Sequence, residues 1–243
     1  MNFRRGAGHR LPIEDAQRLM LPWDLLDSAR IPESRGELCL YRRGDEFSIR
    51  VDRDELMNSR VHGSEETLAR IACDRVAGRP HARVLIGGLG MGYTLAAALE
   101  RLGADSRVVV AELAPAVVEW NRGPLAALAG HPLRDERVTV FEGDVAEVLK
   151  AESQAYDAIV LDVDNGPEGF TRKANDWLYA RSGLTRAFAA LRSGGVFAVW
   201  SATPDRAFTF RLRCAGFKVE DFRVPAGAGA GGRHTIWIAS RGA

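Results

Sequence analysis

The sequence contains a series of short, continuously apolar runs between residues 84 and 239, and most of them are followed by a helix-like segment. Apolar runs without polar alternation are typical of strands that are covered on both faces, as in a parallel sheet. This alternation of strands and helices constrains the fold more than any other feature, and it predicts an α/β class. Strands are expected at Val84–Ile86, Val108–Ala111, Val138–Phe141, Ala158–Leu161, Val196–Trp200, Phe217–Val224 and His234–Ala239.

The helical segments between these runs predict a doubly wound sheet, because each helix can return the chain to start a parallel strand. The last two strands are joined by Pro225–Gly232, a connector rich in glycine and alanine with no helical pattern. We therefore predict a mostly parallel, seven-stranded Rossmann-like sheet that ends in an antiparallel hairpin. The helices are expected over Met91–Leu102, Pro115–Arg122, Val145–Lys150, Ala174–Leu191 and Asp205–Cys214.

A small β lobe is expected ahead of this sheet. Residues 1–35 carry scattered prolines and are expected to be an irregular lead-in, whereas residues 37–42 and 46–52 are strand-like runs joined by a short glycine-containing turn. This pattern predicts a β-hairpin. Ser64 then precedes an amphipathic run and is expected to be the N-cap of a helix. The predicted domains are residues 1–62, the lead-in and small β lobe, and residues 63–243, the Rossmann-like domain.

Composition and charge exclude several classes of protein. Of the 243 residues, 46% are hydrophobic, which is enough to build a substantial core and excludes a wholly disordered chain. The 33 Lys and Arg residues balance 32 Asp and Glu residues, so the formal net charge is +1. Such a balance provides no global attraction for nucleic acid or for an anionic membrane surface.

The cysteines and the N-terminal segment favour a reducing compartment. Cys39, Cys73 and Cys214 are far apart and form no CxxC pair, so free thiols are expected. No apolar stretch follows the basic residues near the N-terminus, and no apolar run is long enough to span a bilayer. The histidines have no partners at metal-ligand spacing. We therefore expect a cytoplasmic protein without metal, nucleic acid or membrane partners.

The first candidate site is the glycine cluster Gly87-Gly88-Leu89-Gly90-Met91-Gly92 between a predicted strand and a predicted helix. Glycines there let the backbone turn tightly and approach a ligand, which the helix N-terminus also faces, although such turns can serve packing alone. A dinucleotide site requires G-x-G-x-x-G, and Tyr93 stands at the third glycine position. The G-x-G-x-G spacing is similar to that of proteins that bind adenosyl-sulfonium cofactors, the class I methyltransferases and their relatives. The expected cofactor-binding residues here are Gly88, Gly90, Met91 and Gly92.

Carboxylates follow the next two strands. Glu112, next to Leu113, can accept hydrogen bonds from both hydroxyls of a ribose that lies over the glycine turn. Asp144, next to Val145, can border the adenine and accept from its amine, and it is also a plausible N-cap of the following helix. All four residues are therefore predicted to belong to the cofactor site.

A third group of carboxylates, Asp162 and Asp164, follows the fourth strand. Strand ends in an open α/β sheet face the ligand crevice, so these side chains are expected near the reactive end of the cofactor. A carboxylate there can accept a proton from an ammonium substrate and orient the resulting amine for attack. The aromatic residues Trp177, Tyr179 and Trp200 lie close to this crevice and either wall a substrate pocket or belong to the core.

The stretches GGLGMG, VVVAELAP, FEGDVAEVL and YDAIVLDVDNGP occur in the order and spacing seen in spermidine synthase-like proteins, and the chain resembles this family of polyamine aminopropyltransferases over residues 37–240. The resemblance implies that Glu112 binds ribose, Asp144 binds adenine and Asp162, supported by Asp164, accepts the proton. It also implies a cytoplasmic transferase, decarboxylated S-adenosylmethionine as the cofactor, a small amine as the second substrate and a homodimer.

The glycine turn departs from the family pattern, which usually reads GGGDGG and uses its Asp to hold the amine of the cofactor. Gly90 and Met91 stand at the matching stretch, so no acid is present there. Three alternatives follow. The likeness and the β lobe favour aminopropyl transfer. The missing acid favours an S-adenosylmethionine-dependent methyltransferase. The third alternative is a non-catalytic relative that has kept the nucleoside-binding site and lost the reaction.

Overall fold

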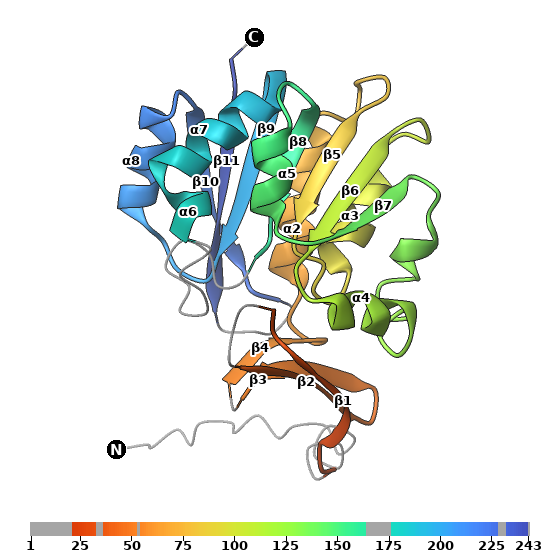
Figure 1. Ribbon diagram of the computed structural model, residues 1–243. Coiled ribbons are helices and arrows are strands. Elements are labelled where there is room, and N and C mark those ends of the chain that lie inside the picture. Colours follow the sequence, from red (N-terminus) through yellow and green to blue (C-terminus); the bar gives the residue numbers. More distant parts are fainter. Residues whose placement is uncertain (1–20, 33–35, 53, 164–175, 228–231, 243) are drawn as a thin grey trace, which may run out of the picture.

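The large domain is built on a seven-stranded sheet with the strand order β10-β11-β9-β8-β5-β6-β7. The computed structural model describes residues 21–32, 36–52, 54–163, 176–227 and 232–242. Strands β9, β8, β5, β6 and β7 run parallel, and β11 and β10 continue the sheet antiparallel (Figure 1). The predicted sheet and its terminal hairpin are therefore confirmed. The strands are β5 (Arg83–Gly87), β6 (Arg107–Glu112), β7 (Val138–Glu142), β8 (Tyr156–Leu161), β9 (Leu191–Ser201), β10 (Lys218–Pro225) and β11 (Arg233–Ser240).

The order of the parallel strands reverses next to β5. From β5 the chain winds outward to β6 and β7, and it then returns to form β8 on the other side of β5. Adjacent loops at such a reversal leave in opposite directions, which opens a crevice at the carboxyl ends of the strands. The fold thus places its ligand crevice between the ends of β5, β6 and β8.

Helices cover both faces of this sheet. Figure 1 shows α2, α3 and α4 on one face and α5, α6, α7 and α8 on the other, in agreement with two separate clusters of buried apolar side chains. Each cluster packs against one side of the sheet, and the side chains of the central strands β5 and β8 are buried on both faces, whereas those of the edge strand β7 are half-buried or exposed. The helices are α2 (Gly63–Asp74), α3 (Tyr93–Arg101), α4 (Pro115–Arg122), α5 (Val145–Ala151), α6 (Asp176–Tyr179), α7 (Arg181–Ala190) and α8 (Arg206–Cys214), with a 3-10 turn η1 (Pro132–Arg134).

The N-terminal lobe is an antiparallel sheet of four strands, β1 (Asp24–Arg30), β2 (Glu37–Arg43), β3 (Glu46–Val51) and β4 (Asp54–Asn58). It lies against the large domain at the carboxyl ends of the parallel strands (Figure 1). Within the described residues, side-chain hydrogen bonds connect the two parts. The Trp120 indole donates to Asp27 Oδ2 over 2.7 Å, and the Tyr93 hydroxyl donates to the Ser59 carbonyl over 3.2 Å.

Two expectations for this lobe are corrected. The segment expected to be an irregular lead-in contains β1, and the expected hairpin gains β4, so the lobe is a sheet of four strands. Most β1 side chains are exposed, and the strand is held by backbone pairing with β2, so no apolar pattern marks it. The division of the chain at residues 62 and 63 stays a prediction.

Three helix boundaries also differ from the expectation. Helix α2 begins at Gly63 after His62, and Ser64 is no cap because its hydroxyl is bound to His234 on β11. Helix α3 begins at Tyr93, later than predicted, since Gly92 before it has a left-handed backbone. The helix expected over Ala174–Leu191 consists, within the described residues, of α6 and α7, and Leu191 already belongs to β9.

The three cysteines are free thiols, as predicted; Cys39 and Cys73 are buried and Cys214 is exposed. Within residues 21–32, 36–52, 54–163, 176–227 and 232–242, every helix is too short or too polar to cross a bilayer.

Candidate active site

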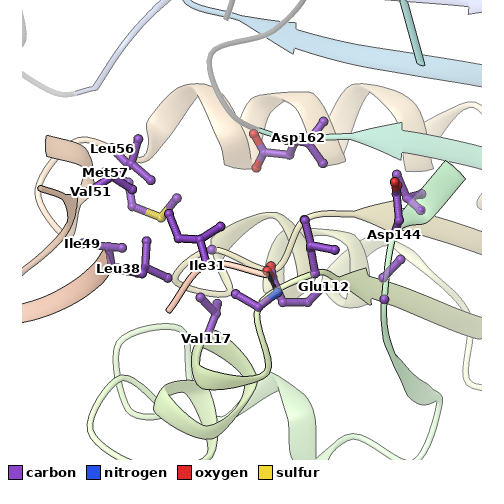
Figure 2. A pocket seen from close by; sticks show the side chains of 18 residues that line it. Ile31, Leu38, Ile49, Val51, Leu56, Met57, Glu112, Val117, Asp144 and Asp162 are labelled. Carbon is purple, nitrogen blue, oxygen red and sulfur yellow. Dashed lines mark hydrogen bonds between the residues drawn. The ribbon is translucent and has the colours of Figure 1, made fainter. Parts of the chain in front are cut away.

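A cavity lies between the carboxyl ends of the parallel strands and the N-terminal lobe. Figure 2 shows three acidic side chains, Glu112, Asp144 and Asp162, on the strand side of this cavity. Apolar side chains close the opposite side, and most of them come from the lobe. We call it the first cavity. Its apolar wall consists of Ile31, Leu38, Ile49, Val51, Leu56, Met57 and Val117.

The glycine turn after β5 is pressed against the backbone of two neighbouring strands. Gly88 has φ +87°, and its N–H donates to the Ala111 carbonyl over 2.9 Å. A Cβ at Gly88 would lie 2.3 Å from the carbonyl oxygen of Asp162, closer than any atom can pack. Glycine at residue 88 is therefore required both by the left-handed backbone and by this contact.

Gly90, in the same turn, faces the lobe. Its φ is +52°, and a Cβ there would lie 3.1 Å from Sδ of Met57, which lines the first cavity. The thioether of Met57 thus occupies the space into which a side chain at residue 90 would extend. Where the pattern GGGDGG has an acidic side chain, this chain has Gly90, and the apolar side chain of Met57 lies next to it.

Glu112 ties the glycine turn to the end of β6. Its Oε2 accepts from the N–H of Leu89 and its Oε1 accepts from the N–H of Ala114, each over 2.9 Å. Two backbone donors fix the carboxylate at the rim of the first cavity, where Leu113 also lies. The local sequence explains this position, because Glu112 is the last residue of β6 and the chain turns at Ala114 into α4.

Asp144 is the N-cap of α5, as one of its two predicted roles requires. Its Oδ1 accepts from the N–H of Ala146 over 2.8 Å, and the neighbouring Val145 lines the same cavity. Because the cap uses this oxygen, the carboxylate is held in one orientation at the edge of the cavity.

Asp162 follows β8, and its half-buried side chain lies at the edge of the first cavity. The Thr94 hydroxyl, on the first turn of α3, donates to Oδ2 over 2.5 Å. Burial raises the pKa of Asp162 to about 6, while the hydrogen bond from Thr94 acts in the opposite direction. A carboxyl group with a pKa near neutrality can accept and release protons at physiological pH.

A second, smaller cavity adjoins the first behind Asp162. The two cavities share Leu56, Met57, Gly90 and Asp162. The second cavity is also lined by Glu65 from α2, by Tyr93 and Thr94 from α3, by Trp200 from β9, and by Leu89 and Met91 from the glycine turn. Its volume of about 50 Å³, against about 160 Å³ for the first, suits a short chain rather than a ring system.

Glu65 carries the second carboxyl group at this place. Burial, followed by repulsion from Asp162 and from Glu66, raises the pKa of Glu65 to about 9. Its Oε2 is buried and has no hydrogen-bond partner. The pair Glu65 and Asp162 therefore places unusual electrostatic strain at the junction of the two cavities.

The structure brings most of the predicted site residues together. Those that line the first cavity are Gly88, Gly90, Glu112, Leu113, Asp144, Val145 and Asp162. Met91 lines the second cavity instead. Gly92 lines neither of these two cavities, and a Cβ there would meet Asn121 and Pro132. Asp164 lies outside the described residues.

Sequence reasoning missed the apolar wall of the lobe, Thr94, and the position of Glu65. An acidic residue in the first turn of a helix is ordinary, so Glu65 carries no signal of its own. Among the aromatic residues, Trp200 lines the second cavity, whereas Tyr179 is buried in the core against Phe208. Within the described residues, no group of three or more His, Cys, Asp or Glu side chains could hold a metal ion.

The glycine turn and the strand-end carboxylates lie at the reversal of a doubly wound sheet, which is where such sheets bind their ligands, and the fold is that of class I methyltransferases. A family model for the spermine/spermidine synthase domain matches residues 65–205. The chain belongs to this family. The family and the fold indicate a transferase. A search of curated proteins found no match.

Solved structures show the same fold at low sequence identity. A spermidine synthase from Thermotoga maritima is 19% identical, with a TM-score of 0.72 over 90% of this chain and 73% of that chain. A spermidine synthase in complex with the transition state analogue AdoDATO is 19% identical, with a TM-score of 0.70 over 90% of this chain and 72% of that chain. The O-methyltransferase TomG from Streptomyces achromogenes, in complex with SAM, is 19% identical, with a TM-score of 0.53 over 74% of this chain and 80% of that chain.

Proposed function

We propose that the protein transfers an aminopropyl group from decarboxylated S-adenosylmethionine to a small amine. One observation carries this proposal: among the described residues that line the two cavities, every charged side chain is a carboxylate. Decarboxylated S-adenosylmethionine bears a sulfonium and an ammonium group and has no carboxylate. Its charge therefore complements the lining, whereas the carboxylate of intact S-adenosylmethionine meets no cationic side chain there.

The first cavity supplies the parts of a nucleoside site. The glycine turn allows close approach of the ligand to the backbone. In this proposal Glu112 binds the ribose hydroxyls and Asp144 accepts from the adenine amine, and both roles are supported by the position of these residues, with Leu113 and Val145, in the lining of one cavity. The apolar wall of the lobe can cover the adenosine and exclude water from the reacting sulfur.

Asp162 is proposed as the proton acceptor, with Asp164 as a supporting residue. The acceptor nitrogen attacks the propyl carbon that is bonded to the sulfonium sulfur. The new C–N bond forms as the C–S bond breaks, and sulfur keeps the electron pair, so that neutral methylthioadenosine leaves. The nitrogen loses one proton to Asp162. Thr94 occupies Oδ2 of Asp162, which makes Oδ1 the oxygen available to the amine.

Methyl transfer from intact S-adenosylmethionine is the second candidate. The apolar contact between Gly90 and Met57 favours it, because no acid stands there to hold an aminopropyl ammonium group. The fold match to an O-methyltransferase in complex with SAM is compatible with it. A relative that binds the nucleoside without turnover is the third candidate.

Product analysis separates these candidates. The protein is incubated with each cofactor and a panel of diamines and polyamines, and the released nucleoside is identified by mass spectrometry. We expect methylthioadenosine from the decarboxylated cofactor. Release of S-adenosylhomocysteine alone would establish a methyltransferase. Nucleoside binding by calorimetry without any product would establish the non-catalytic relative.

A further inference from the structure

The second cavity has side-chain acceptors to offer but its side-chain donors are already used. The Trp200 indole N–H donates to Ser64 Oγ over 3.0 Å, and the Tyr93 hydroxyl donates to the Ser59 carbonyl over 3.2 Å. The third donor, the hydroxyl of Thr94, is bound to Asp162. Once Glu65 is ionised, a ligand of this cavity must therefore bring hydrogen-bond donors of its own.

Glu65 has the most evident need for such a donor. Its buried Oε2 has no partner, and a buried acceptor without one costs on the order of 1–3 kcal/mol. Asp162, across the cavity, repels it electrostatically. Among the described lining residues, no Lys, Arg or His side chain offsets the two carboxyl groups. A cation between them would satisfy the oxygen and remove the repulsion together.

The aromatic rings of the cavity add to the attraction for a cation. The polar hydrogens of Tyr93 and Trp200 are donated elsewhere, so these two lining residues offer the cavity no side-chain donor. An aromatic ring attracts an ammonium group that approaches its face. Both rings are held in place by other contacts. Tyr93 stacks on His62 at 3.9 Å, and Ser64, which accepts from Trp200, is itself bound to His234 Nδ1 over 2.8 Å.

We infer that the second cavity binds a primary alkylammonium group between Glu65 and Asp162, and that Glu65 determines the specificity of the enzyme for it. This inference rests on the proposed function for the identity of the reaction. The two cavities meet at Asp162, Met57 and Gly90, so a chain that begins at the sulfonium can reach the second cavity. The ammonium group belongs either to the aminopropyl chain of the cofactor or to the acceptor amine.

Binding of the cation should release a proton. The groups that act on Glu65 are Asp162 from the end of β8 and Glu66 from its own helix, and Tyr93 of α3 faces it. With a pKa of about 9, Glu65 holds its proton at pH 7.5 in the free protein. An ammonium group that donates to both carboxylates displaces this proton into the buffer.

The experiment compares Glu65→Gln with Glu66→Gln, a neutralisation one residue further along the same helix. Glu66 is ion-paired with Arg70 and His62 and lines neither cavity. Turnover is measured with decarboxylated S-adenosylmethionine and 1,4-diaminobutane. We expect at least a tenfold rise in one KM for Glu65→Gln, a kcat within about threefold, and unchanged binding of methylthioadenosine. A rise in the KM of the cofactor assigns the ammonium to the aminopropyl chain, and a rise in the KM of the diamine assigns it to the acceptor.

A second readout does not need turnover. Calorimetric titration with 1,4-diaminobutane, and separately with decarboxylated S-adenosylmethionine, in phosphate and in Tris buffer gives the number of protons released. We expect release from the wild type and from Glu66→Gln, and none from Glu65→Gln. If Glu65→Gln does not fold, Glu65→Asp keeps the charge on a shorter side chain, and an intermediate rise in the same KM is expected.

The outcomes for the inference and for the proposed function are distinct. Turnover with both KM values within twofold of the wild type in Glu65→Gln overturns the inference and leaves aminopropyl transfer intact. An unchanged KM in Glu65→Asp, when Glu65→Gln does not fold, overturns it as well. Binding that depends on Glu65 and releases a proton, without any turnover by the wild type, supports the ammonium site and contradicts the proposed function.

Discussion

A carboxylate stands near each end of strand β8, and the two have opposite surroundings. Asp157, near the start of the strand, is 3% exposed and accepts from Arg79 over 2.9 Å and from Arg192 over 2.7 Å. The backbone N–H of Arg83 is a third donor, at 2.8 Å. Asp162, directly after the strand, accepts one side-chain hydrogen bond, from Thr94. Asp157 is buried and has three donors, whereas Asp162 is half-buried at the edge of two cavities and has one side-chain donor.

Asp157 and Asp162 differ in how fully their carboxylates are satisfied by protein donors. Two arginines and a backbone amide saturate Asp157, so it fastens β8 to the segments around it. Asp162 lacks a cationic partner among the described residues, and burial raises its pKa to about 6. Unsatisfied charge of this kind costs stability, and it is typically found where a ligand supplies the missing partner.

The largest expected effect is that of Asp162→Asn on activity. The variant should lose a factor on the order of 10²–10⁴ in kcat/KM, because the group that takes the proton is gone. The melting temperature should be equal to or above that of the wild type at pH 8, since a half-buried charge with a raised pKa is removed. Product formation and thermal unfolding measure the two effects. Full activity of the variant would show that another group accepts the proton.

Asp157→Asn should give the opposite pattern. Removing the charge weakens hydrogen bonds from two arginines that are each about one-third exposed, so we expect a loss of about 2 kcal/mol in the free energy of unfolding. For a chain of this size this corresponds to a melting temperature lowered by roughly 4–8 °C. The activity per folded molecule at 25 °C should be unchanged. A specific loss of turnover would mean that the two ends of β8 are not functionally separate.

Thr94→Val should change the pH profile more than the maximal rate. The hydrogen bond from Thr94 lowers the pKa of Asp162, so its removal raises that pKa further. The wild-type rate should fall as the pH drops through about 6, and the acid limb of the variant should lie at higher pH. We expect a few-fold loss at pH 6 relative to the wild type and little change at pH 8.5. An acid limb that stays in place would show that Asp162 is not the group that titrates.

The smallest expected effect concerns stability and Glu65. Its folded-state pKa of about 9 lies above its ordinary value of 4.5, so the folded protein holds the proton more tightly than the unfolded chain. The stabilising contribution is complete below pH 4.5 and is lost as the pH rises to about 9. The melting temperature of the wild type should therefore fall relative to Glu65→Gln between pH 5 and pH 9. The melting temperature of Glu66→Gln should follow the same pH dependence as that of the wild type.

Much of the large domain could be predicted because burial on both faces leaves continuous apolar runs. The strand ends then located Glu112, Asp144 and Asp162, which line one cavity in the structure. Strand β1 was not predictable in this way, because its side chains are mostly exposed and its pairing with β2 is made by the backbone.

The proximity of Glu65 and Asp162 could not be predicted from the sequence, for a different reason. Glu65 and Asp162 belong to elements that are far apart along the chain, and only the packing of α2 beside the end of β8 brings them to one cavity. The same holds for Ser64, whose hydroxyl looks like a helix cap by sequence but bonds to a histidine on the last strand. Long-range contacts of this kind leave no local periodicity.

The contact between Gly88 and the carbonyl of Asp162 has a consequence for how the protein can change. There is no room for even one carbon atom between the turn proposed to face the nucleoside and the backbone of the residue proposed to take the proton. A substitution that adds a side chain at residue 88 must therefore displace the backbone of Asp162, and we expect it to disturb both proposed roles at once. Room for new substrates must come from the lobe or from α2.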